Sequence, residues 1–212
     1  MMQLLRNIIF LLIFLHVASH SIAQNFNGGL MAGVAGTQVA GDTYGGFNKA
    51  GIFAGGFVNL QITQHSAFQM ELEFFQKGSR ENPDSTNNYD QYLFRVNYVE
   101  LPFLYQYIVN KRFKIEAGPS LGFLIGYYEE KNSYEIKNGN RPANVTFQVN
   151  LGLSVSLSSH WSANLRTNNS MINIRSDNAT GDVIRIFPGN YGQFNDCLVL
   201  SLFYQFNPSP DW

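Results

Sequence analysis

Seven charged side chains recur at alternating positions within segments that are otherwise rich in apolar residues. They are Glu71, Glu73, Lys77, Glu100, Lys114, Glu116 and Arg166. Paired carboxylates can act together as a general acid and a general base. Carboxylates that lie beside Lys or Arg can instead form buried ion pairs. Which chemistry applies depends on the elements that carry these residues and on the direction in which each side chain points.

A strict two-residue alternation runs through residues 145–157. Every odd-numbered residue there is apolar, and every even-numbered residue is Thr, Gln, Asn, Gly or Ser. Because successive side chains of a β-strand point to opposite faces, this segment predicts a strand with one apolar and one polar face. Weaker strands are predicted in the glycine-rich segments 26–37 and 47–60. Similar alternation predicts strands in 68–75, 98–107, 113–125, 161–166 and 198–206, which brings the total to eight.

The connections between these strands alternate in length. Long polar connections span 38–46, 78–91, 129–143 and 176–195, and short ones span 61–66, 109–112 and 158–160. Outer-membrane barrels have short periplasmic turns and longer outer loops, whereas a soluble sandwich has no reason to sort its loops in this way. The predicted fold is therefore an all-β, eight-stranded, antiparallel up-and-down transmembrane barrel with both termini in the periplasm.

The composition also favours an exterior that contacts lipid. Charged residues make up 14% of the chain and aromatic residues 15%, whereas an ordinary soluble domain has about 25% charged residues. Aromatic side chains are expected at both headgroup zones. The residues expected on the side of the short turns are Phe26, Tyr105, Tyr107, Phe113, Trp161 and Phe206, and those on the side of the long loops are Tyr92, Phe94, Tyr127 and Tyr128.

The first residues have the pattern of an export signal. Arg6 is the only charge before the apolar stretch 8–18, and the small residues Ser21 and Ala23 follow. This pattern predicts a Sec signal peptide over residues 1–23, so that residues 24–212 form one barrel in the bacterial outer membrane. A buried N-terminal helix is the alternative interpretation. The single Cys197 can form no internal disulfide.

If the apolar faces of the strands contact lipid, the seven charged residues line the barrel interior. Eight strands leave an interior just wide enough for side chains to fill, and buried charges must be paired. We therefore expect Glu, Lys and Arg to form a structural network that plugs the lumen. A narrow ion path or a ligand site remains the alternative use of the same residues.

Several segments of this sequence resemble a known family. They are Gly28–Gly33, Lys49–Ile52, Glu71–Ser79, Tyr98–Leu104 and Ala117–Pro119. In this order they resemble the PorT-like "porin family" of outer-membrane β-barrels of Bacteroidota. The resemblance implies an eight-stranded barrel and, for some members, a role in type IX secretion and gliding. It offers no catalytic residues to carry over, and the word porin in the family name does not establish a pore.

Other chemistry is not predicted. His65 and His160 lie in two short turns on the periplasmic side, away from an outer-rim catalytic site. The segment 84–90 has alternating oxygen ligands but lacks the Gly and bidentate Glu of a calcium-binding EF-hand loop. We therefore expect no catalytic residue, no cofactor and no metal site. The apolar residues of the last long loop, Ile184, Ile186, Phe187, Tyr191 and Phe194, either form a contact surface or fold over the barrel mouth.

The leading functional hypothesis is a non-enzymatic barrel with a structural or assembly role, linked to protein secretion. Its expected partners are outer-membrane lipid, the barrel-insertion machinery and secretion or envelope proteins. A net charge of −1 gives no reason to expect a nucleic-acid partner. A narrow passive porin for small solutes is the first alternative, and an outer-membrane enzyme is the second.

Overall fold

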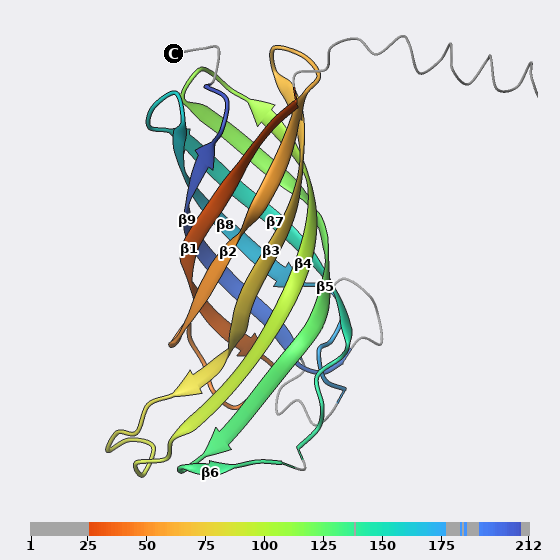
Figure 1. The fold of residues 1–212 in the computed structure, drawn as a ribbon. Coiled ribbons are helices and arrows are strands. Elements are labelled where there is room, and N and C mark those ends of the chain that lie inside the picture. Colours follow the sequence, from red (N-terminus) through yellow and green to blue (C-terminus); the bar gives the residue numbers. More distant parts are fainter. Residues whose placement is uncertain (1–25, 138, 177–182, 184, 186–190, 209–212) are drawn as a thin grey trace, which may run out of the picture.

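The computed structural model describes residues 26–137, 139–176, 183, 185 and 191–208. In these residues the chain forms strands joined by turns and loops (Figure 1). The strands are β1 (Phe26–Ala40), β2 (Lys49–Gln61), β3 (Ser66–Glu81), β4 (Tyr92–Ile108), β5 (Phe113–Lys131), β6 (Tyr134–Glu135), β7 (Val145–Ser156), β8 (Trp161–Ser170) and β9 (Phe194–Gln205). Among the described residues no helix is long and apolar enough to cross a membrane.

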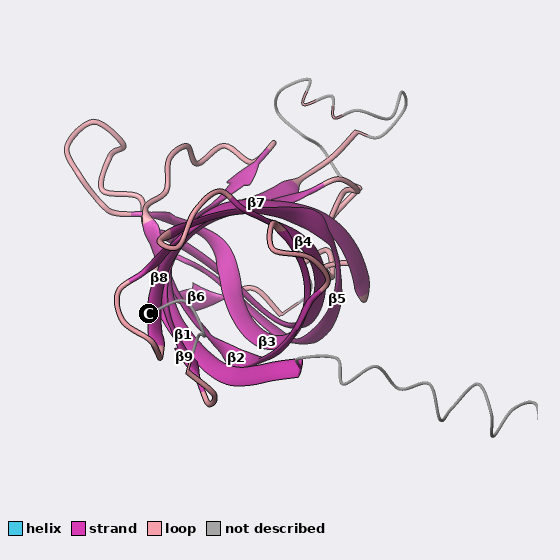
Figure 2. Ribbon diagram, turned by 90° about the horizontal axis from the view of Figure 1, so that it is seen from above, coloured by secondary structure: helices cyan, strands magenta, loops and turns pink. Residues whose placement is uncertain are grey.

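Eight antiparallel strands close into a barrel. The strand order is β4-β3-β2-β1-β9-β8-β7-β5, and β4 also pairs with β5, which completes the ring seen in Figure 2. The two-residue β6 pairs only with β5, in an outer loop. Closure pairs the backbone groups of each strand with both neighbours, which hydrocarbon requires of any spanning sheet. The predicted eight-stranded up-and-down barrel is confirmed.

The side chains of β7 show how the faces are divided. Val145 and Leu151 are exposed on the outside of the barrel, whereas Thr146, Gln148 and Asn150 are fully buried inside it. The same alternation holds along β3, where Phe68, Met70 and Leu72 are exposed. The two strands thus present an apolar face to the exterior of the barrel and a buried polar face to its interior.

The strands extend further toward the long loops than the alternation predicts. β3 continues to Glu81 and β5 to Lys131, so residues 78–81 and 129–131, which were assigned to loops, are strand residues. β1 likewise runs to Ala40, and β9 begins at Phe194. Beyond the lipid the outer face meets water, so its residues need not be apolar and the alternation disappears from the sequence. In Figure 1 this extension is seen as the long β3–β4–β5 wall that projects beyond the other strands.

Only one of the two predicted aromatic groups lies on the outer surface as expected. On the side of the short turns all six predicted aromatic residues are exposed. On the side of the long loops, Tyr92 and Phe94 point into the barrel and are 7% and 1% exposed. Even-numbered residues of β4 face inward from Tyr92 to Gln106, so these two rings share the inner face with Glu100. The prediction for Tyr92 and Phe94 was wrong because it used their position along the strand and ignored their parity.

Candidate functional site

Arg166 on β8 lies at the centre of a charged network inside the barrel. Its Nη1 and Nη2 atoms donate to the two oxygens of Glu71 at 2.6 and 2.8 Å. Its Nε atom donates to Glu116 Oε1 at 2.8 Å, and Glu73 Oε2 lies 3.8 Å from Nη1. The arginine is 2% exposed. The network therefore links β3, β5 and β8 across the lumen through bidentate, charge-assisted hydrogen bonds.

A second ion pair lies in the same interior. Lys77 Nζ is 2.5 Å from Glu100 Oε1, and it donates to Asn168 Oδ1 at 2.6 Å. Asn168 Nδ2 in turn donates to the other oxygen of Glu100 at 3.0 Å. Lys77 and Glu100 belong to the segments Glu71–Ser79 and Tyr98–Leu104, so the two most specific segments of the family resemblance meet in one buried contact.

Polar residues complete the hydrogen bonding around the carboxylates. Asn164 and Gln106 donate to the two oxygens of Glu116 at 2.8 and 3.0 Å. Lys114, half-buried at the end of the barrel near the short turns, lines a cavity of about 30 Å³ together with Glu116 and Asn164. A cavity of this size holds only a water or two. Of the seven predicted residues, six lie in the buried network and Lys114 lies at its periplasmic end.

The interior is less polar than we predicted. An apolar cluster covers the inner faces of β1, β2 and β9 and reaches β3. Its members are Met31, Ala35, Phe53, Phe57, Phe75, Cys197, Val199 and Phe203. The cations lie against its rings: Lys77 Nζ is 4.4 Å from the centroid of Phe75. The interior is thus divided into an apolar part and a charged part. The glycines of β1 and β2 obscured this inner face in the sequence.

Sequence reasoning missed a further cluster near the outer mouth. Arg175 donates to both oxygens of Glu129, at 3.2 and 2.7 Å, and the hydroxyl of Tyr92 donates to Glu129 Oε1 at 2.6 Å. The guanidinium of Arg175 lies 4.0 Å from the centroid of Phe94, and Tyr44 stacks on Tyr92. These contacts join β4, β5 and the segment after β8 near the outer mouth of the barrel.

Glu129 was missed because residues 129–143 were predicted to form a loop, whereas β5 continues through a β-bulge to Lys131. Asn97 pairs with Gly126 and Tyr98 with Leu124, so Ile125 is an extra residue in β5. An extra residue reverses which positions face inward beyond it. Odd-numbered residues of β5 face lipid before the bulge, but Glu129 faces the lumen. The alternation pattern does not mark the bulge. The charge of Glu129, which follows the predicted strand directly, is the one sequence signal for an inward-facing position there.

Glu73 differs from the other carboxylates of the network. Its Oε2 atom is buried without a hydrogen-bond partner, and four buried carboxylates there face two buried cations, Lys77 and Arg166. Glu73→Gln removes surplus negative charge. It should therefore either raise the free energy of unfolding or lower it by less than about 1 kcal/mol. Glu71→Gln should lower it by about 3 kcal/mol, because Arg166 loses its bidentate partner. Urea unfolding in detergent measures both, and an equal loss for the two variants would contradict the assignment.

The described residues contain no cluster of His, Cys, Asp and Glu able to hold a metal ion. His65 Nδ1 lies 3.1 Å from the carbonyl oxygen of Ile108, and His160 Nδ1 lies 2.9 Å from that of Gln205. Both histidines therefore contact the backbone at the end of a neighbouring strand, β4 for His65 and β9 for His160. Ile184, Ile186 and Phe187 of the last loop lie outside the described residues. Phe194 is buried and Tyr191 is exposed.

The fold, the exposed apolar exterior and the charged interior define an outer-membrane β-barrel protein. The sequence matches the family described as "Outer membrane protein beta-barrel domain" over residues 20–176. That segment is most of the chain, so the chain belongs to this family. It is a protein of the bacterial outer membrane, and its barrel exterior contacts lipid.

Two solved structures share the fold. The attachment invasion locus protein Ail of Yersinia pestis has 11% sequence identity and a TM-score of 0.50, with 85% of this chain and 98% of Ail covered. Neisserial surface protein A has 10% identity and a TM-score of 0.52, with 85% and 97% covered. At these identities the likeness is one of fold alone. No curated protein matches the sequence.

Proposed function

We propose that this protein is a plugged, non-conducting and non-enzymatic barrel with a structural or assembly role in the outer membrane. The observation that carries the proposal is the filled lumen. Arg166, Lys77, Glu71 and Glu100 are each at most 2% exposed, and the largely buried Arg175–Glu129 pair lies near the outer mouth. A solute would have to break several charge-assisted hydrogen bonds to pass.

Planar-bilayer recording of the purified barrel tests this proposal. We expect no steady single-channel current from the wild type, because the network occupies the lumen. The triple variant Glu71→Ala, Glu116→Ala and Arg166→Ala removes the central side chains together with their charges and should conduct. Large, steady currents from the wild type would favour a passive pore for small solutes, for which the small polar cavity beside Lys114 would be the periplasmic entrance.

A link to protein secretion rests on the PorT-like segments. Lys77 and Glu100 come from two of these segments and form one ion pair inside the barrel. The partners of the protein in this role would be secretion or envelope proteins. Export of type IX cargo in a strain that lacks the protein tests the link. Normal export in that strain would contradict the link to secretion. It would not affect the assignment of the protein as an outer-membrane barrel.

We also propose that residues 1–23 are a signal peptide and that residues 24–212 are the mature barrel, which the barrel-insertion machinery inserts. The charge and apolar pattern of the first residues supports this proposal. N-terminal sequencing of the protein from outer membranes is expected to begin at Gln24. A mature protein that begins at Met1 would contradict it.

A further inference from the structure

The lipid-facing surface of the β3–β4–β5 wall ends at a sharp boundary. The last apolar row consists of Phe74, Val99 and Phe123, which are paired across the three strands. In the next outward row Gln76 Nε2 donates to Asn97 Oδ1 at 3.2 Å. On β3 and β4 the outer face therefore changes from apolar to polar within two residues of Val99, whereas on β5 the exposed Ile125 continues the apolar surface one step further.

Arg95 occupies the following row on the same outer face. It pairs with Gly78 on one side and with Tyr128 on the other, and its side chain is exposed. Arg95 lies four residues from Val99 along a tilted strand. This separation corresponds to about 9 Å along the membrane normal. The headgroup zone begins just beyond the hydrocarbon core and is about 5–8 Å deep on each side. A long arginine side chain at this height reaches lipid headgroups.

Two further cations lie close to Arg95. Lys49 begins β2, the strand next to this wall; its side chain lies on the inner face and is 2% exposed, and its Nζ atom donates to the carbonyl oxygen of Ala50 at 3.4 Å. The positive charges of Lys49 and Arg95 repel each other. Arg80 lies one row further out on β3 and is exposed. Within the described parts of the chain, none of these three cations forms an ion pair.

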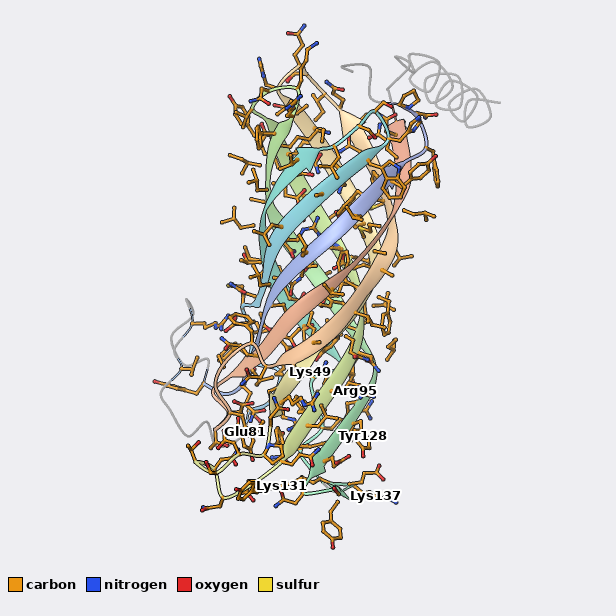
Figure 3. All side chains as sticks on the ribbon, turned by 90° about the vertical axis from the view of Figure 1, so that its left-hand side faces the viewer. Lys49, Glu81, Arg95, Tyr128, Lys131 and Lys137 are labelled. Atoms are coloured by element: carbon orange, nitrogen blue, oxygen red, sulfur yellow. The ribbon has the colours of Figure 1, made fainter. Side chains whose placement is uncertain are left out.

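The neighbouring carboxylates are engaged elsewhere. Glu130 accepts the hydroxyl hydrogen bond of Tyr128 at 2.6 Å, and Glu81 accepts one from Asn87 at 3.0 Å. Both lie further from the membrane than Arg95. Figure 3 shows Lys49 and Arg95 nearer the middle of the barrel, and Glu81, Tyr128, Lys131 and Lys137 nearer its outer end. The membrane side of this wall thus carries positive charge without a compensating anion.

We propose that Arg95, together with Arg80 beyond it on the same outer face, binds a phosphate group of the phosphorylated glycolipid of the outer leaflet. A guanidinium at headgroup height matches a phosphate through paired hydrogen bonds. The bound phosphate would also offset the mutual repulsion of Arg95 and Lys49. This site is independent of the lumen, so it stands whether or not the barrel conducts.

Native mass spectrometry of the purified full barrel with lipid A tests the site. The probes are bisphosphorylated lipid A and the same lipid with both phosphates removed. The wild type should retain the phosphorylated form about tenfold more strongly, as expected when one or two charge-assisted hydrogen bonds are gained. Arg95→Gln should abolish most of this preference, and Arg95→Lys should keep part of it.

A matched control removes the same kind of charge at the opposite end of the barrel. Lys111→Gln with Arg112→Gln alters two exposed cations in a short periplasmic turn and should leave the preference unchanged. Heat-dependent gel mobility checks that every variant is folded. Three results would overturn the proposal: equal retention of the two lipids by the wild type, equal loss in the control variant, or displacement of lipid A by millimolar inorganic phosphate, which would indicate a site for free anions.

Discussion

Arg166→Met should lower the free energy of unfolding by about 3–5 kcal/mol, which is the usual result of removing one partner from a buried ion pair. The substitution keeps most of the side-chain volume but leaves Glu71 and Glu116 without the guanidinium that bridges them. Their remaining partners, Gln69, Gln106 and Asn164, are neutral amides. Urea unfolding in detergent, followed by the fluorescence of Trp161 and by gel mobility, measures the loss.

A compensated variant separates charge from packing. Arg166→Met combined with Glu71→Gln and Glu116→Gln removes the unpaired charges and should recover more than half of the lost stability. If the compensated variant is as unstable as the single one, the loss comes from packing and the network is not held by its ion pairs. If Arg166→Met itself costs less than about 1 kcal/mol, the lumen is accessible to water in solution.

Leu151→Arg should destabilise the inserted barrel by about 2–4 kcal/mol, the usual cost of an arginine on the lipid face at the middle of the membrane. Leu151 lies midway along the apolar face of β7 and is 57% exposed. On a protein surrounded by water, the same exposure would make this substitution nearly neutral. Unfolding of the barrel in phospholipid vesicles by guanidinium chloride measures the effect.

Leu157 provides the matched control, because it lies at the end of the same apolar face and is 55% exposed. Its amide donates to the carbonyl oxygen of Trp161 in a short turn, at the edge of the membrane. Leu157→Arg should therefore cost no more than about 1 kcal/mol. Equal costs at the two positions would show that depth in a membrane is irrelevant to this surface.

The alternation of residues 145–157 determined the fold because lipid and interior impose opposite requirements on adjacent side chains. The same parity placed Glu71, Glu73, Glu100, Glu116 and Arg166 inside the barrel, where the structure shows them. The lengths of the connections predict which end of the barrel faces the periplasm. These features are local and repeat along the chain, so the sequence alone contains them.

Only the tertiary structure decided which charges meet. Closure brings Arg166 on β8 to Glu71 on β3 and Glu116 on β5, strands far apart in the sequence, and register brings Lys77 to Glu100 on the neighbouring strands β3 and β4. The bulge at Ile125 turned Glu129 inward to Arg175. Parity specifies a face, whereas a contact across the lumen depends on strand stagger and closure, which arise only when all eight strands pair.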